Sequence, residues 1–207
     1  MLTFYTKNGY VLGETISALQ KEIRRGSEEE AMYWALELCP KYENYFWRRI
    51  IIIVNEDIGL ANPFLQVYVG VQKQLYFEGR ERGESPILIL SNLILALCRS
   101  PKSRLADNFY CAVVQDKLNS PRKEIPDYAI DQHTQKGRAL GRGMDHFFAE
   151  CVVLNPLPSS DILGLSSDDT GNYEERAKEY WTGKKPMQKD EPWPSKGKKE
   201  NPQMEMF

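Results

Sequence analysis

The two histidines of the chain each lie beside a carboxylate. His133 follows Asp131 by two positions, and His146 directly follows Asp145. Imidazole and carboxylate groups bind catalytic metals such as zinc, so one hypothesis is a metal-dependent nuclease or phosphohydrolase built from these side chains. Such enzymes need further ligands at fixed helical offsets, and no such pair accompanies the histidines. We therefore favour histidines that donate to nearby carboxylates or cap helices, and expect no metal.

A basic segment punctuated by glycine follows His133. Lys136, Arg138 and Arg142 place positive charge beside the flexible backbone of residues 137–143. The phosphate loop of ATPases needs a lysine followed by a hydroxyl side chain in the pattern G-x-x-x-x-G-K-[ST], and that motif occurs nowhere in the sequence. The segment favours a turn at a helix end. A weak contact of these basic side chains to phosphate or DNA is the alternative.

The cysteines form no pair that would bind a metal or exchange electrons. They are Cys39, Cys98, Cys111 and Cys151, so neither a zinc ribbon nor a C-x-x-C motif is available. Buried, reduced thiols in a cytoplasmic protein are the simplest interpretation. The nucleophile elbow G-x-S-x-G is also missing. The sequence therefore predicts a chain that is not an enzyme and carries no cofactor.

Length and composition predict one globular domain with an appendage. The chain has 207 residues, of which 42% are hydrophobic and 27% are charged. A formal net charge of −2 gives no overall attraction to nucleic acid, so such binding would need a local basic patch. The N-terminus lacks the layout of a secretory signal, and the longest apolar run, Ile50–Val54, is too short to cross a bilayer. We expect a cytoplasmic protein without a membrane partner.

The helical spacing of apolar residues predicts an all-α fold. Apolar positions from Ile16 to Ile23 share one face of a helix that Gly26 can close. Ser27 is expected to cap a second helix, with Glu30 completing a capping box and Pro40 ending the helix. We expect these two helices to form a hairpin.

The segment from Phe46 to Ile58 is apolar on nearly every side. Its β-branched run, Ile50–Val54, would suit a buried strand, but we prefer a central helix because the neighbouring segments are helical. A helix that is apolar all round must be covered by its own domain or by another subunit. Further helices are predicted at 64–77, at 87–98 and from Pro101 onward, followed by a last segment punctuated by glycine at 131–150.

The composition changes after Leu154. Serine, proline, lysine and glycine are frequent in residues 155–202, which cannot build a core. We predict a mostly disordered linker there, with a short helix at 173–181. The sequence thus divides into a helical domain at 1–154, this linker, and a terminal peptide at 203–207.

Several motifs resemble the C-terminal region of the RarA/MgsA family of AAA+ ATPases, whose eukaryotic relative is the Werner-helicase-interacting protein. Residues 17–36 (SALQKEIRRGSEEEAMYWAL) are similar to the start of that region, and residues 55–63 (NEDIGLANP) to its EDIGLADP signature. Residues 100–103 with Tyr110 are similar to its PKSN…AY segment, and residues 126–134 (PDYAIDQHT) match PLHLRNAPT more loosely. The signature positions are Glu56, Asp57, Gly59, Pro63, Pro101, Lys102, His133 and Thr134.

The resemblance implies an all-helical domain that forms tetramers at stalled replication forks. It spans residues 16–148 with the order of the motifs kept. Because the sequence begins where the family's ATPase core would have ended, the resemblance does not carry ATP hydrolysis to this chain. We expect a stand-alone homologue of the oligomerisation domain. Glu56 and Asp57 are expected to satisfy helix ends or interface partners, not to catalyse a reaction.

The end of the sequence resembles the bacterial sliding-clamp-binding pentapeptide, in which glutamine is followed by a short apolar residue, Ser or Asp, Leu or Met, and Phe. Gln203 can hydrogen-bond at the rim of a pocket that Met206 and Phe207 fill, with Met204 and Glu205 between them. Glu205 departs from the usual Ser or Asp.

These observations predict a homo-oligomeric accessory of DNA replication or repair that is tethered to the sliding clamp. A scaffold that co-assembles with a full-length AAA+ partner is one alternative. The metal-dependent nuclease or phosphohydrolase is the other.

Overall fold

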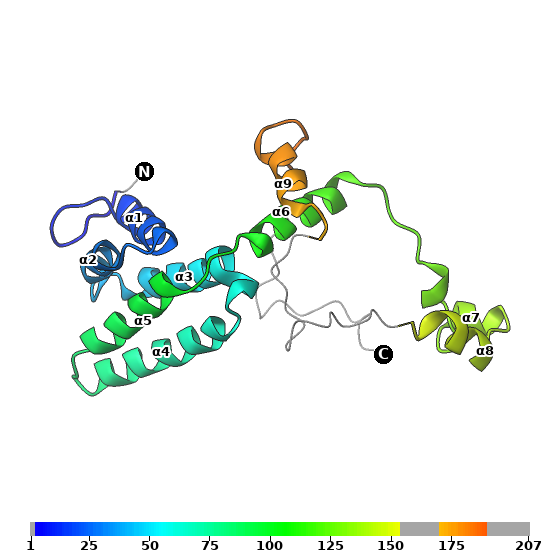
Figure 1. Ribbon diagram of the computed structural model, residues 1–207, viewed down its shortest axis with the longest axis horizontal. Coiled ribbons are helices and arrows are strands. Elements are labelled where there is room, and N and C mark those ends of the chain that lie inside the picture. The colour runs from blue at the N-terminus through cyan, green and yellow to red at the C-terminus, as the bar shows by residue number, and fades with distance from the viewer. Residues whose placement is uncertain (1–2, 154–169, 190–207) are drawn as a thin grey trace.

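The computed structural model describes residues 3–153 and 170–189, which form helices joined by short turns (Figure 1). Over these residues the extended structure is limited to one isolated bridge between Tyr5 and Val11. The predicted all-α fold is therefore confirmed for the described part of the chain. The longer α-helices are α1 (Leu12–Arg25), α2 (Glu28–Leu38), α3 (Glu43–Ile53), α4 (Phe64–Glu81), α5 (Ile87–Arg99), α6 (Leu105–Asn119) and α9 (Tyr173–Trp181).

Shorter elements connect them. A π-helical turn, η1 (Val54–Ile58), extends α3, and a 3-10 turn, η2 (Gly59–Ala61), follows it. Beyond α6 come the 3-10 turn η3 (Asp127–Ala129), the short helices α7 (Gln135–Ala139) and α8 (Met144–His146), and a second π-helical turn, η4 (Phe147–Cys151). Within the described ranges, no helix has both the length and the apolar composition that a bilayer span requires.

The predicted hairpin of α1 and α2 is present, and Gly26 makes its turn. Gly26 has a φ of 78°, and a Cβ added to it would lie 3.3 Å from the carbonyl oxygen of Cys98. Glycine is therefore required both by the backbone conformation and by the close approach of α5. The capping box predicted for Ser27 is wrong, because its side chain makes no capping hydrogen bond. Its ψ of 87° is not the extended value at which a cap hydroxyl reaches the first-turn amides.

Helix α3 covers most of the segment predicted as a central helix, but it is not buried all round. Phe46, Trp47, Ile50 and Ile53 are at most 1% exposed and face the other helices. Residues 51 and 52, both isoleucine, are 42% and 43% exposed. This chain therefore covers one face of α3 and leaves apolar side chains on the other.

The next helices follow the prediction at α4 and α5 and depart from it at Pro101. Helix α6 begins at Leu105, because residues 100–104 form a loop whose hydrogen bonds are not those of a helical turn. The backbone N–H of Ser103 donates to the carbonyl of Asp57 at 2.9 Å, and the Ser103 hydroxyl accepts from the N–H of Leu105 at 3.2 Å. A tertiary hydrogen bond thus replaces the first helical turn that proline favours.

The core lies where α1 to α5 meet, at one end of the molecule in Figure 1. It combines aliphatic side chains from every one of these helices with aromatic rings from α3 and α4. Its largest fully buried members are Trp47, Tyr76, Phe46, Leu19, Ile23, Leu38, Ile50, Ile53, Ile58, Leu90, Leu93 and Ile94.

Helix α9 packs against α6 and forms a second, smaller apolar cluster. Figure 1 shows α9 beside α6, and Cys111 and Ala112 of α6 form this cluster with Ala177 and Tyr180 of α9. The helix runs over the residues at which the sequence predicted it, within the segment expected to be a linker. The described part of that segment therefore belongs to the folded structure. The division at residue 154 stays a prediction.

Residues 127–151 fold into a compact segment of η3, α7, α8 and η4, which in Figure 1 lies apart from the α1–α5 body. The Thr134 hydroxyl caps α7 by accepting from the N–H of Gly137 at 2.9 Å. A Cβ at Gly137 would lie 1.7 Å from the carbonyl oxygen of Asp131, so only glycine fits there. The glycine-punctuated turn predicted in this region is confirmed.

Candidate functional site

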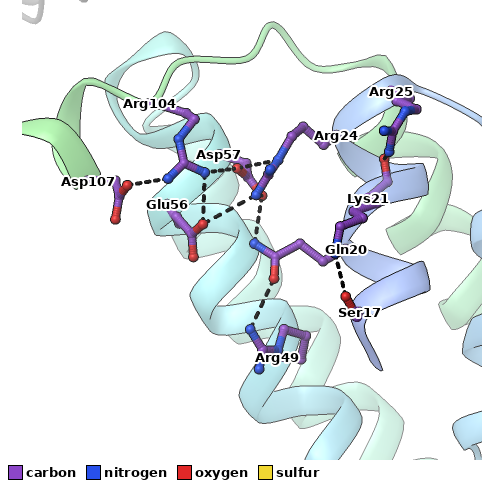
Figure 2. Close-up of polar contacts among 10 residues, drawn as sticks. All are labelled: Ser17, Gln20, Lys21, Arg24, Arg25, Arg49, Glu56, Asp57, Arg104 and Asp107. Carbon is purple, nitrogen blue, oxygen red and sulfur yellow. Dashed lines mark hydrogen bonds and ion pairs between the residues drawn. The ribbon is translucent and has the colours of Figure 1, made fainter. Parts of the chain in front are cut away.

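The most unusual polar group in the core is the carboxylate of Asp57, which has no exposed surface. Asp57 and Glu56 lie in the π-helical turn η1, which inserts an extra residue after α3 and turns the Asp57 side chain toward α1 and α6 (Figure 2). Such π-helical turns occur frequently at functional sites. A buried carboxylate also requires partners of opposite charge.

Two arginines from distant parts of the chain supply that charge. The Arg24 Nε of α1 lies 2.9 Å from the Asp57 Oδ1, and its Nη2 donates to the Asp57 Oδ2 at 3.3 Å. From the start of α6, the Arg104 Nη1 donates to the Asp57 Oδ1 at 3.2 Å and to the Glu56 Oε1 at 2.9 Å. Figure 2 shows both guanidinium groups converging on the two carboxylates. The result is one ion-pair network that joins α1, η1 and α6.

An uncharged side chain, Gln20, and a third carboxylate, Asp107, are also part of the network. The Gln20 Nε2 donates to the Asp57 Oδ2 at 3.0 Å, and the Gln20 Oε1 accepts from the Arg49 Nη1 at 3.0 Å. On the far side, Asp107 accepts from Arg104. Each oxygen of the Asp57 carboxylate therefore has at least two donors or cations within 3.3 Å.

Charge and burial act in opposite directions on Arg104. Burial disfavours the charged guanidinium, but the hydrogen bond to Glu56 and the negative charges of Asp107, Glu56 and Asp57 outweigh that cost and raise the pKa of Arg104. Its side chain is nevertheless 38% exposed, and that of Arg24 is 37% exposed. The two arginines thus form the side of the network that faces solvent, whereas the Asp57 carboxylate is buried.

Neighbouring residues fix the turn on which the carboxylates sit. Gly59 has a φ of 50° and a ψ of −127°, a backbone conformation that side chains disfavour, and its Cβ position lies 3.5 Å from the Cβ of Ala106. Lys102 donates to the carbonyls of Leu97, Cys98 and Ser100 at 2.9, 2.9 and 2.6 Å and so caps the end of α5. Burial lowers the pKa of its ammonium group.

This arrangement orders the helices and does not offer an acid, a base or a nucleophile to a substrate. Both Asp57 oxygens are already bound, and the carboxylate is closed off from solvent. The chemistry available is charge pairing across three elements, which sets their relative positions.

Comparison with known proteins places these elements in a family. The family model described as MgsA AAA+ ATPase C terminal matches residues 26–155, which include α2 to α6 and both members of the Glu56–Asp57 pair. The chain belongs to this family. The RarA/MgsA resemblance carried by residues 55–63 and 100–103 is therefore confirmed.

Among curated proteins the chain is similar to several bacterial members and one eukaryotic ATPase. Replication-associated recombination protein A of Bacillus subtilis is 29% identical over 143 residues, covering 69% of this chain and 34% of that protein. The Escherichia coli K12 protein of the same name is 27% identical over 139 residues, covering 66% and 30%. ATPase WRNIP1 of Dictyostelium discoideum is 26% identical over 145 residues, covering 69% and 16%. The chain spans about a third of the length of these bacterial relatives.

The MgsA-type signature residues fall into two places. Glu56, Asp57, Gly59 and Pro63 lie in and just after η1, and Pro101 and Lys102 lie in the loop that η1 binds through Ser103. His133 and Thr134 precede α7 in the separate compact segment. The structure therefore brings the first two blocks together and leaves the third apart from them.

The histidines of this MgsA-type domain each pair with a different aspartate. The His133 Nδ1 lies 2.6 Å from the Asp131 Oδ2, and the contact lowers the pKa of that carboxyl. The His146 Nε2 lies 3.5 Å from the Asp127 Oδ2, while neither pair includes Asp145. Among residues 3–153 and 170–189, no group of three or more His, Cys, Asp and Glu side chains is placed to hold a metal ion.

Sequence reasoning missed a second partner of His146. The Cys151 Sγ lies 3.5 Å from the His146 Nδ1, which gives the order thiol, imidazole and carboxylate found in cysteine hydrolases. Partial burial and the charge of Asp131 raise the pKa of the Cys151 thiol, however, so the neutral form is favoured over the nucleophilic thiolate. None of the four cysteines forms a disulfide, as expected from their spacing.

Two of the basic residues expected to contact phosphate already bind the backbone of their own segment. Arg138 donates to the carbonyl of His133 at 2.8 Å, and Arg142 donates to that of Asp127 at 2.9 Å and pairs with the Asp127 carboxylate. Lys136 is exposed and has no partner of this kind among the described residues. The expected clamp-binding residues, 203–207, lie outside the described residues.

Proposed function

We propose that this chain is a non-enzymatic, oligomeric accessory of DNA replication or repair that works in the cytoplasm. Membership of the MgsA AAA+ ATPase C-terminal family carries the proposal, because the bacterial relatives are replication-associated recombination proteins. The Asp57 network supports an architectural role, since its carboxylates are occupied by arginines and hold three elements in register.

An exposed apolar stripe on α4 supports self-association. Phe64, Val67, Val71 and Leu75 are 67%, 70%, 49% and 41% exposed, and their spacing places them along one side of the helix. Monomeric proteins rarely leave contiguous apolar surface of this kind uncovered. We infer that the stripe meets a second copy of the chain, with a tetramer as the form that the family resemblance implies. The same surface would also suit a full-length AAA+ partner with a similar domain.

The peptide Gln203–Phe207 is proposed to recruit the assembly to the bacterial sliding clamp. Met206 and Phe207 are apolar anchors of the kind that dominate small interfaces, and Gln203 supplies a hydrogen-bonding group beside them. In this proposal residues 1–154 with α9 form the body, and residues 190–202 connect it to the peptide.

A pull-down from the native cell tests the proposal as a whole. The full chain should retain the clamp and other replication proteins, and a chain that ends at Pro202 should lose the clamp while still retaining its own copies. Calorimetric titration with Mg-ATP should show no saturable heat, because the sequence lacks the phosphate-loop motif. Micromolar ATP binding, or a full chain that retains no replication protein, would contradict the proposal.

A further inference from the structure

Two hollows meet on the surface where α6 ends and the connection to α7 begins. The larger, of about 690 Å³, is lined by residues of α6 and α9, among them Lys117 of α6 and Arg176 of α9. The smaller, of about 510 Å³, lies along the connection and reaches Lys136 in α7. Arg122 and Lys123 line both hollows, so the two lie next to each other.

The polar lining of this surface is mainly cationic. We name Lys117, Arg122, Lys123, Lys136 and Arg176 the basic track. Its lysines and Arg122 are exposed, and among the described residues none of their side chains makes an ion pair or a hydrogen bond. Arg176 differs, because it pairs with Asp116 and its guanidinium carbon lies 5.4 Å from the centre of the Tyr173 ring.

The nearby carboxylates do not cancel this charge. Asp116 is held by Arg176 and then by the Tyr180 hydroxyl, which together lower its pKa, so its charge is already paired. Glu124 is the carboxylate on the smaller hollow. Four unpaired cations therefore face one unpaired carboxylate, in a chain whose formal net charge is −2. Such a local excess on a slightly acidic protein marks a surface for a polyanion.

We propose that the basic track binds the phosphodiester backbone of a nucleic-acid strand. Two neighbouring hollows with cations lining both suit a repeating anion better than a single phosphate. Val113, Pro121 and Tyr173 add apolar lining beside the cations, which is the combination that strand-binding grooves use for bases and backbone. Of the residues that the sequence associated with phosphate, Lys136 lies on the track.

Helix α9 is essential to this surface, because it supplies Arg176 and Tyr173. It lies beyond residue 155, where the match to the family model ends. The inference rests on the proposed role in replication or repair, and it gives that role a nucleic-acid contact. It does not involve the clamp-binding peptide.

Fluorescence anisotropy with the full chain and a labelled oligothymidylate of about twenty nucleotides tests the inference. At about 50 mM salt, the Kd of the variant Arg122→Ala/Lys123→Ala/Lys136→Ala for the oligothymidylate should be higher than that of the wild type by about tenfold or more. The slope of log Kd against log salt should fall by about 2, since each lost phosphate contact on a single strand contributes about 0.7. These side chains have no partner among the described residues, so the melting temperature should stay unchanged.

The matched control is Lys7→Ala/Arg48→Ala/Lys73→Ala, which removes the same charge from cations elsewhere on the body. It should bind the strand within about twofold of the wild type. Equal weakening in both variants would show that only net charge matters and would overturn the track. If thymidine monophosphate at the same phosphate concentration displaces the strand, the track binds a single nucleotide. That result would overturn the proposal that its ligand is a strand.

A chain that ends at Pro202 separates this inference from the clamp proposal. It should bind the oligothymidylate as tightly as the full chain does and should no longer bind the clamp. Loss of strand binding on this truncation would place the contact in the terminal peptide and overturn the track. If the full chain binds the strand but does not bind the clamp, only the proposed recruitment to the clamp is contradicted.

Discussion

Arg24 and Arg104 are 80 positions apart, by subtraction of their residue numbers, and bind the same oxygen of Asp57, with nitrogen–oxygen distances of 2.9 and 3.2 Å. One guanidinium belongs to α1 and the other to the start of α6, so the carboxylate between them joins the first helix of the body to the helix that carries α9. We therefore expect the stability of the folded chain to depend on this buried charge.

Replacing Asp57 by asparagine tests that dependence. The variant keeps the shape of the side chain but leaves two guanidinium groups without their buried counter-charge. We expect a loss of about 3 kcal/mol in the free energy of unfolding, measured by urea denaturation with circular dichroism. The control is Glu84→Gln, which removes an exposed carboxylate paired with Arg82 and should leave the urea midpoint unchanged. An unchanged midpoint for Asp57→Asn would contradict the structural role of the network.

The docking of α9 on α6 should depend on pH in a defined direction. The hydrogen bond from Tyr180 to Asp116 raises the pKa of the tyrosine to about 12 and contributes to lowering that of the aspartate. Because the tyrosine pKa is raised, its contribution to stability is complete below the ordinary value near 10 and is lost as pH rises toward 12. Because the aspartate pKa is lowered, its contribution is present above about 4 and is lost in more acidic solution.

Absorbance at the phenolate band can detect the alkaline limb. Subtracting the titration of Tyr180→Phe from that of the wild type isolates this tyrosine, and the difference should have its midpoint near 12. In Asp116→Asn, where the anionic acceptor is gone, the midpoint should move toward 10. An isolated signal already centred near 10 in the wild type would mean that Tyr180 does not donate to Asp116 in solution.

Self-association should depend on the apolar stripe of α4. The variant Val67→Glu/Val71→Glu places two charges on that stripe, so we expect light scattering at micromolar concentration to show monomers where the wild type shows a larger assembly. The melting temperature of the monomer itself should not fall, because Val67 is 70% exposed and Val71 49% exposed. The control Tyr128→Glu/Leu140→Glu alters equally exposed apolar residues of the compact segment at 127–151 and should leave the assembly intact. A wild-type chain with a strictly monomeric mass would contradict this prediction.

Local patterns predicted the helices well where local forces decide them. The range of α9 was predicted because acidic residues begin it and its apolar side chains recur at helical spacing, and Gly26 was sufficient to predict the turn between α1 and α2. The start of α6 was missed because Ser103 bonds to Asp57, a contact across 46 positions, by subtraction, that no local pattern contains.

The candidate site was predicted only as a motif. The NEDIGLANP stretch identified Glu56 and Asp57, which were expected to satisfy helix ends or interface partners. In the structure they pair instead with arginine side chains of the same chain. Their partners were not predicted, because Arg24 and Arg104 stand in charged stretches where any arginine could be solvated. Of the basic track only Lys136 was singled out from the sequence, since the track appears only when α9 and the connection to α7 are brought beside α6.

The most direct test of the proposed function is surface plasmon resonance of the full chain against the host's sliding clamp. The wild type should bind with a Kd on the order of micromolar, about what a short peptide with two apolar anchors supports. The variant Met206→Ala/Phe207→Ala should show no binding at tenfold higher concentration, and its melting temperature should match that of the wild type. Equal binding by both proteins, or no binding by the wild type at about ten times the expected Kd, would contradict recruitment to the clamp.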